Sequence, residues 1–421
     1  MRGDTILCSS PHLLVMQEGG DFFIPFGYLP YYAILFVLGV IINGMKLSRE
    51  AGLGIVVAVL FVAVAGGWAW FFMGRSGTIE TTEAVVEDTA ATGAVRDTEP
   101  KNSNGVSALA GLQCDNWNRR PIAAMYASDF QARPTSGFSK ADMVFELPVT
   151  PNIITRFMAV YQCNDAGDMG SLRSSRHDFL QVARSIDAVY VHWGGSHFAL
   201  DKIKEGIIEN LNCNNDGGKS AENYCYRRAQ IGKMRSEDTG YMEFAKVLQA
   251  IKDTGYRTTN EFSGYPHAPE AALADRGQGG TININYPGRM KVSFDYDRAK
   301  NAYLRTWDDE FDIDRNNSER LAPKNVAVLE VRVDDLEGQY VNLQFGDPWY
   351  DSIETGPAHY FMNGKTMKGT WYKSKSAVDS KLYFYDEAGK EISFVPGQTW
   401  VSAFDPMKGA PGKSVFEYLA R

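Results

Sequence analysis

GSLRSSRHDFLQVARSIDAVYVHWGGS, residues 170–196, reads as a loop, a helix and a strand in succession. Ser175 and Asp178 have capping-box spacing, which predicts that the helix starts at Ser175. The apolar face that follows has helical spacing, at Phe179, Val182, Ala183 and Ile186. The apolar run at 187–193 then predicts a strand closed by two glycines. A helix that leads directly into a strand is typical of a mixed α/β domain.

The flanking sequence extends this pattern in both directions. Ser196 is expected to cap a second helix, and residues 241–256 predict a third that ends at Gly255. β-rich runs at 121–127, 143–149 and 153–162 precede the opening stretch. From Thr281 onward, alternating apolar and polar runs predict a mainly antiparallel β domain. The predicted fold class is α+β, with an α/β domain at 112–270 and a smaller β-rich domain at 271–421.

A long uncharged segment precedes the folded region. Residues 53–73 read LGIVVAVLFVAVAGGWAWFFM, which is long enough to cross a membrane as a helix. Lys46 and Arg49 before it place the C-terminal part outside the cytoplasm. Residues 1–52 are either a first spanning segment or an over-extended start, since Met45 begins a run typical of a signal anchor. Residues 74–111, poor in aromatic residues, predict a flexible linker.

Four cysteines follow the predicted membrane segment. An oxidising compartment would allow them to pair, and three pairings are possible. We prefer Cys114–Cys163 with Cys213–Cys225, because the second pair flanks one loop rich in Asn, Gly and Ser. Four free buried thiols are the alternative. The absence of any Cys-x-x-Cys pair argues against a structural zinc site.

Composition and motifs narrow the function classes. The chain has 421 residues, a net charge of −8 and 44% hydrophobic residues, so a nucleic-acid partner is not expected. We find no Walker loop, HExxH motif, EF-hand loop or dinucleotide fingerprint. No cofactor and no metal are therefore expected.

The candidate ligand-binding residues cluster around the opening stretch. Arg173 and Arg176, with Ser174 and Ser175 between them, lie at a predicted helix N-terminus, where free N–H groups and forked Arg donors suit a carboxylate or a phosphate. The alternative is an internal ion-pair network with Asp142, Glu146 or Asp178.

Two further positions could carry chemistry. His192 ends a strand before Gly194 and could act as a base, donate to a ligand, or be a satisfied core histidine. Arg156 lies in an apolar strand and needs a partner, for which Glu146 on the neighbouring strand is the natural choice. Asp142 and Glu146 could also serve as a pair of carboxylates.

Several of these motifs resemble a known family. The matching stretches are residues 120–125, 132–146, 154–159, 170–176, 187–196, 369–371, 384–392 and 396–400. They resemble the YerB-like family of bacterial envelope proteins, a domain of unknown function. The resemblance implies two domains and an extracytoplasmic location, usually through a lipid anchor. Family members typically carry an Ala-Pro-His-Asn stretch before the third helix, and residues 231–240 here lack that His.

Three function classes follow from these observations. The first is a membrane-anchored, non-catalytic module that binds an anionic cell-wall component, or a partner in wall synthesis, through Arg173 and Arg176. The second is an enzyme acting on the wall, with His192 as the base in the same cleft. The third is a structural scaffold whose polar motifs are internal ion pairs. In each, the chain is attached to the cell membrane by one or two passes.

Overall fold

The computed structural model describes residues 105–421, except 231, 233, 288, 289, 351 and 409–414, together with the backbone of 12–17 and 20–25. The chain divides into two units, at residues 1–94 and 95–421. In the first, β1 (His12–Gln17) and β2 (Gly20–Pro25) form an antiparallel hairpin. The predicted membrane segment at 53–73 and nearly all of the predicted linker lie outside the described residues. Among the residues that are described, no helix has the length and apolar character needed to cross a membrane.

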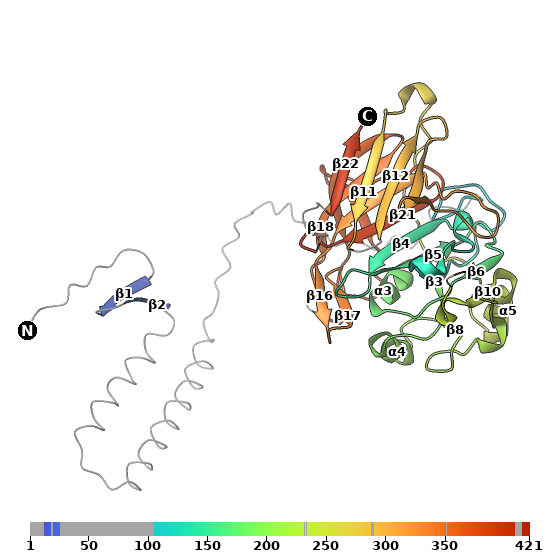
Figure 1. The fold of residues 1–421 in the computed structure, drawn as a ribbon, viewed down its shortest axis with the longest axis horizontal. Coiled ribbons are helices and arrows are strands. Elements are labelled where there is room, and N and C mark those ends of the chain that lie inside the picture. Colours follow the sequence, from blue (N-terminus) through green and yellow to red (C-terminus); the bar gives the residue numbers. More distant parts are fainter. Residues whose placement is uncertain are drawn as a thin grey trace, which may run out of the picture. The chain divides into compact units, whose positions relative to one another are not determined.

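The second unit is organised around a mixed sheet of ten strands (Figure 1). The sheet contains strands from both halves of this unit, joined where β21 pairs in parallel with β4, Thr399 opposite Met143. In spatial order the strands are β20 (Tyr383–Asp386), β19 (Lys365–Tyr372), β18 (Thr355–Met362), β15 (Asn325–Glu330), β21 (Thr399–Phe404), β4 (Met143–Pro148), β5 (Thr155–Tyr161), β3 (Ile122–Ala127), β7 (Val189–His192) and β8 (Asn210–Asn212). The two halves therefore share one hydrophobic core rather than two separate ones.

Smaller sheets complete the fold. An antiparallel sheet of five strands consists of β14 (Glu310–Phe311), β13 (Ala302–Trp307), β12 (Lys291–Asp297), β11 (Gly280–Asn285) and β22 (Phe416–Ala420). A sheet of three strands consists of β6 (Asp168–Gly170), β10 (Gly240–Glu243) and β9 (Cys225–Arg227), and β16 (Val333–Leu336) pairs with β17 (Tyr340–Leu343). Short 3-10 turns lie at Phe130–Ala132, Phe138–Lys140, Glu222–Tyr224, Ser236–Asp238 and Leu273–Asp275. The mixed α+β class is as predicted.

Three α-helices occur in the described residues: α3 (His177–Ser185), α4 (His197–Lys204) and α5 (Phe244–Thr254). Ser196 caps α4 by accepting a hydrogen bond from the Ala199 N–H, and Gly255 ends α5 with a left-handed φ of 74°, both as predicted. The predicted start of the third helix was wrong, because residues 241–243 pair in the small sheet with Gly170, Met169 and Asp168.

The predicted start of α3 was also wrong. Arg176, not Ser175, occupies the N-cap, and no side chain caps this end of the helix. The Ser175 hydroxyl instead lies 3.0 Å from the hydroxyl of Tyr190 on β7. The Ser175 hydroxyl therefore contacts β7 instead of capping the helix. The predicted apolar face of α3 is fully buried, as expected.

The cysteines form Cys114–Cys163 and Cys213–Cys225, which is the preferred pairing. The first ties the beginning of the folded region to the segment after β5. The second closes the loop between β8 and β9.

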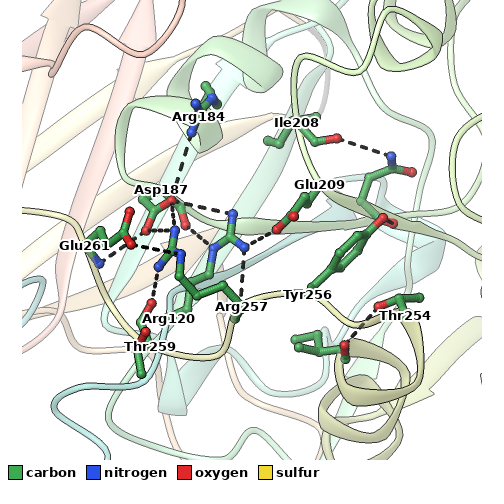
Figure 2. A network of polar contacts seen from close by, with 12 residues as sticks. Arg120, Arg184, Asp187, Ile208, Glu209, Thr254, Tyr256, Arg257, Thr259 and Glu261 are labelled. Carbon is green, nitrogen blue, oxygen red and sulfur yellow. Dashed lines mark hydrogen bonds and ion pairs between the residues drawn. The ribbon is translucent and has the colours of Figure 1, made fainter.

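Charged side chains at the turn from α3 to β7 are closely paired (Figure 2). Arg257 donates to both carboxylate oxygens of Asp187, at 2.6 and 2.7 Å, while Arg120 donates to the Asp187 carbonyl at 2.8 Å and also pairs with Glu209. Arg184 lies 4.0 Å from the same carboxylate. Each of these guanidinium groups thus has a carboxylate partner, which is the usual condition for burying charge.

Candidate functional site

The loop between β6 and α3 is held rigidly by its backbone. The Leu172 N–H donates to the Gly240 carbonyl, the Arg173 N–H to Met125, and the Ser175 N–H to Gly194, at 2.8–2.9 Å. These acceptors belong to three different parts of the sheet structure. A shift of the loop would break these three backbone hydrogen bonds. They therefore hold the backbone of Arg173 and Arg176 in place.

A third arginine reaches the same loop from β5. Arg156 donates through Nη1 to the Ser174 carbonyl. Its surroundings lower its pKa well below the usual value, first through burial and then through repulsion from Arg176 and Arg173. We call Arg156, Arg173 and Arg176 the arginine cluster. It brings together two residues predicted from the loop and one predicted from the strand.

The arginine cluster is only partly neutralised. Arg173 lies 3.3 Å from Asp129 and 3.7 Å from Asp238. For Arg156 and Arg176, no carboxylate lies within 4.0 Å in the part of the chain that the structure describes. Arg176 donates to the Ser175 carbonyl at 2.9 Å and lies over the Tyr340 ring. This differs from the Asp187 network, where every guanidinium is paired.

The position of Arg176 adds to the excess of positive charge. Its buried Nε has no hydrogen-bond partner within the described part of the chain. Arg176 also occupies the N-cap of α3, and this end of the helix carries partial positive charge. Like charges so close together are unfavourable unless an anion joins them. Forked guanidinium groups beside a helix N-terminus can hold a carboxylate or a phosphate.

Glu146 does not belong to this cluster, and its predicted pairing with Arg156 was wrong. The register of β4 and β5 sets Glu146 opposite Phe157 and Leu147 opposite Arg156. Because side chains alternate across a sheet, the two charges point to opposite faces. Glu146 is fully buried and pairs with Arg305 at 2.9 Å, while Trp400 Nε1 donates to the same carboxylate oxygen at 3.1 Å.

Asp142, which directly precedes β4, also forms its hydrogen bonds within the protein. One of its carboxylate oxygens accepts the backbone N–H groups of Gln162 and Cys163. Burial raises its pKa to about 6, although these two hydrogen bonds act in the opposite direction. Asp142 and Glu146 therefore do not form a pair of carboxylates facing a cleft.

This raised pKa predicts a pH dependence of stability. Between the unfolded value near 4 and the folded value near 6, the folded state holds more protons at Asp142, so its stability falls as the pH rises through this window. The loss attributable to Asp142 is up to about 3 kcal/mol. Asp142→Asn keeps an oxygen for both N–H groups. Urea unfolding at pH 4 and pH 6.5 should show a smaller pH-dependent loss in this variant, and an unchanged loss would contradict the assignment.

His192 is a satisfied core residue. It is fully buried, with Nδ1 2.8 Å from the Gly194 carbonyl and Nε2 3.3 Å from the Asn210 side-chain oxygen. Burial lowers its pKa, and its ring stacks on Tyr190. Both ring nitrogens therefore lie within hydrogen-bond distance of protein groups rather than facing a substrate.

Sequence reasoning missed two features. Arg305 lies in β13 at an inward-facing position between Tyr303 and Trp307, and a charge in that alternating apolar pattern was the available signal. The second is a group of buried potential metal ligands, His177, Asp178 and Asp347. His177 and Asp178 are adjacent, but Asp347 is far from them in sequence, so no local spacing could have indicated the group.

Comparison with known proteins gives the family. The N-terminal domain of the family described as protein of unknown function DUF3048 matches residues 109–257, and its C-terminal domain matches residues 282–401. The chain belongs to this family. A Bacillus subtilis (strain 168) member named "Putative lipoprotein YerB" is 26% identical over 330 residues, covering 75% of this chain and 91% of that protein.

The fold is shared with a solved member of the YerB-like family. The crystal structure of YerB protein from Bacillus subtilis matches with a TM-score of 0.62 at 22% sequence identity, covering 75% of this chain and 99% of the crystallised one. Asp238 lies in the stretch where the family resemblance predicts a His, and its carboxylate is 3.7 Å from Arg173.

Proposed function

We propose that this chain is a membrane-anchored envelope protein whose folded part lies outside the cytoplasm and binds an anionic ligand through the arginine cluster. The ligand class is a carboxylate or a phosphate of the cell-wall polymer. The observation that carries the proposal is the incomplete pairing of Arg156 and Arg176 beside the N-terminus of α3. Such a group has a strong electrostatic reason to bind an anion.

The location rests on separate support. The two disulfides suit an oxidising compartment, and the named relative is described as a lipoprotein. In this chain we propose that the apolar segment at 53–73 provides the membrane attachment that a lipid provides elsewhere in the family.

Arg176→Gln should weaken binding to purified peptidoglycan sacculi by roughly tenfold, because one charge-assisted contact contributes about 1.5–3 kcal/mol. Residues 95–421, a separate compact unit, would be incubated with sacculi and the retained fraction measured. The matched control is Arg184→Gln, which removes the same charge at the other end of α3. Equal retention of both variants would place the binding surface elsewhere.

The same assay separates the alternative functions. A wall-acting enzyme would release soluble fragments, and their release would stop in His192→Asn. The two occupied ring nitrogens of His192 favour the non-catalytic module. A scaffold would show neither retention nor release.

A further inference from the structure

The buried group behind the arginine cluster joins the two halves of the fold. His177 and Asp178 open α3, Asn342 lies on β17, and Asp347 follows that strand. All four side chains are at most 2% exposed. The segment from β17 onward packs against the start of α3, where the Asp178 carboxylate accepts the Leu343 N–H at 2.9 Å.

Three donor atoms surround the Nε2 atom of His177 at short range. The Asn342 side-chain oxygen lies at 3.1 Å, an Asp178 oxygen at 3.6 Å and an Asp347 oxygen at 3.8 Å. A tetrahedral metal ion with ligands at about 2.1 Å keeps those ligands about 3.4 Å apart. The separations from Nε2, 3.1–3.8 Å, lie around this value, and the ligand atoms of His177, Asp178 and Asp347 all lie within 4.8 Å of one another.

Several polar atoms in this group lack partners. Among the described residues, the Asp347 oxygen that faces His177 has no hydrogen-bond partner, nor has the second oxygen of Asp178 or Nδ1 of His177. The other Asp347 oxygen is held by the Trp349 N–H at 2.6 Å, which orients the free one. Buried carboxylate oxygens without partners are costly.

Few positive side chains lie close to the carboxyl groups of Asp178 and Asp347. Lys373 is buried nearby, but its ammonium donates to the Ser380 hydroxyl at 2.9 Å and to the Val378 carbonyl. Within the described residues, no lysine or arginine nitrogen lies within 4.0 Å of Asp178 or Asp347. Rings of Phe198, Trp349 and Tyr350 lie beside the His177 ring, with centroids 5.5–6.4 Å from it.

We propose that His177, Asp178, Asn342 and Asp347 bind one divalent transition-metal ion, of the Zn²⁺ or Mn²⁺ class, which fastens α3 to the C-terminal half. One imidazole nitrogen with three oxygens suits these ions. The site is closed on all sides, which is typical of structural rather than catalytic metal centres. Binding through Nε2 requires the imidazole tautomer that carries its proton on Nδ1, and two ionised carboxylates would neutralise the ion.

The test begins with the wild-type unit, residues 95–421, freed of metal with a chelator. Titration with Zn²⁺ alone and with Mn²⁺ alone, followed by elemental analysis after gel filtration, should give about one bound ion per chain for at least one of them. A parallel titration with Mg²⁺, which prefers oxygen ligands alone, serves as the comparison. The bound ion should raise the thermal midpoint by about 5 °C. Less than about a tenth of an ion per chain would overturn the proposal.

Asp347→Asn locates the ion. It keeps the shape of the side chain and should weaken binding at least tenfold, since even outer-shell changes cost roughly 10- to 100-fold. The matched control is Asp405→Asn, another buried carboxylate that accepts a backbone N–H two residues ahead. Equal affinity in the two variants would show that the ion binds elsewhere. A destabilised but still metal-binding Asp347→Asn protein would likewise contradict the site.

Discussion

Arg305→Met should lower the free energy of unfolding by about 3–5 kcal/mol, the usual cost of removing one partner of a buried ion pair. Arg305 is fully buried, pairs with Glu146 at 2.9 Å and also contacts Asp312. Its loss leaves the Glu146 carboxylate charged and buried between the two large sheets. Urea unfolding of residues 95–421 at pH 7 would measure the effect.

Two controls isolate the cause. Arg320→Met removes a partly exposed arginine that reaches the same strand, and its cost should be well below 1 kcal/mol. The double variant Glu146→Gln, Arg305→Met should recover part of the loss, because no charge is left without a partner. A single-variant loss similar to that of Arg320→Met would show that Glu146 is stabilised by other groups.

Replacing Cys114 and Cys163 together by serine should destabilise the protein by about 4 kcal/mol, as the entropy of closing a long loop predicts. The linked residues are 49 apart in sequence, whereas Cys213 and Cys225 are 12 apart. The corresponding change at the second bridge should therefore cost less, about 3 kcal/mol. Denaturant midpoints of the two double variants and the wild type would rank them. The reverse order would mean that native-state contacts, rather than loop closure, dominate.

The sequence predicted elements wherever local chemistry determines them. Ser196 and Gly255 mark helix ends because capping depends on neighbouring residues. Ser175 had the same local signal, but the Tyr190 hydroxyl on β7 takes its side chain. Residues 241–243 were included in the predicted third helix, yet pairing with β6 makes them a strand.

Partners across the sheet were harder to predict. Glu146 and Arg156 are on neighbouring strands, and a register different by one residue would have set them opposite each other. The true partner, Arg305, is 159 residues away from Glu146 in sequence. Strand register and long-range contacts depend on how the whole core packs. The spacing of residues along the sequence does not reveal this packing.

The arginine cluster was partly visible in the sequence. Arg173 and Arg176 stood out because of their spacing before a helix, whereas the proximity of Arg156 became evident only from the fold. His192 seemed well placed at the end of a strand, but its hydrogen bonds are all internal. A residue at the end of a strand is in a common place for ligand binding. Whether its side chain can bind a ligand depends on whether its hydrogen-bonding groups are already engaged within the protein.

The most direct test of the anion site is to titrate residues 95–421 with inorganic phosphate, and separately with acetate, while following arginine side-chain N–H signals by nuclear magnetic resonance. We expect saturable shifts at Arg156, Arg173 and Arg176 with at least one of these anions, and little change at Arg257, which Asp187 already neutralises. Shifts of equal size at Arg257 and the arginine cluster, or no saturable shift at the cluster, would contradict it.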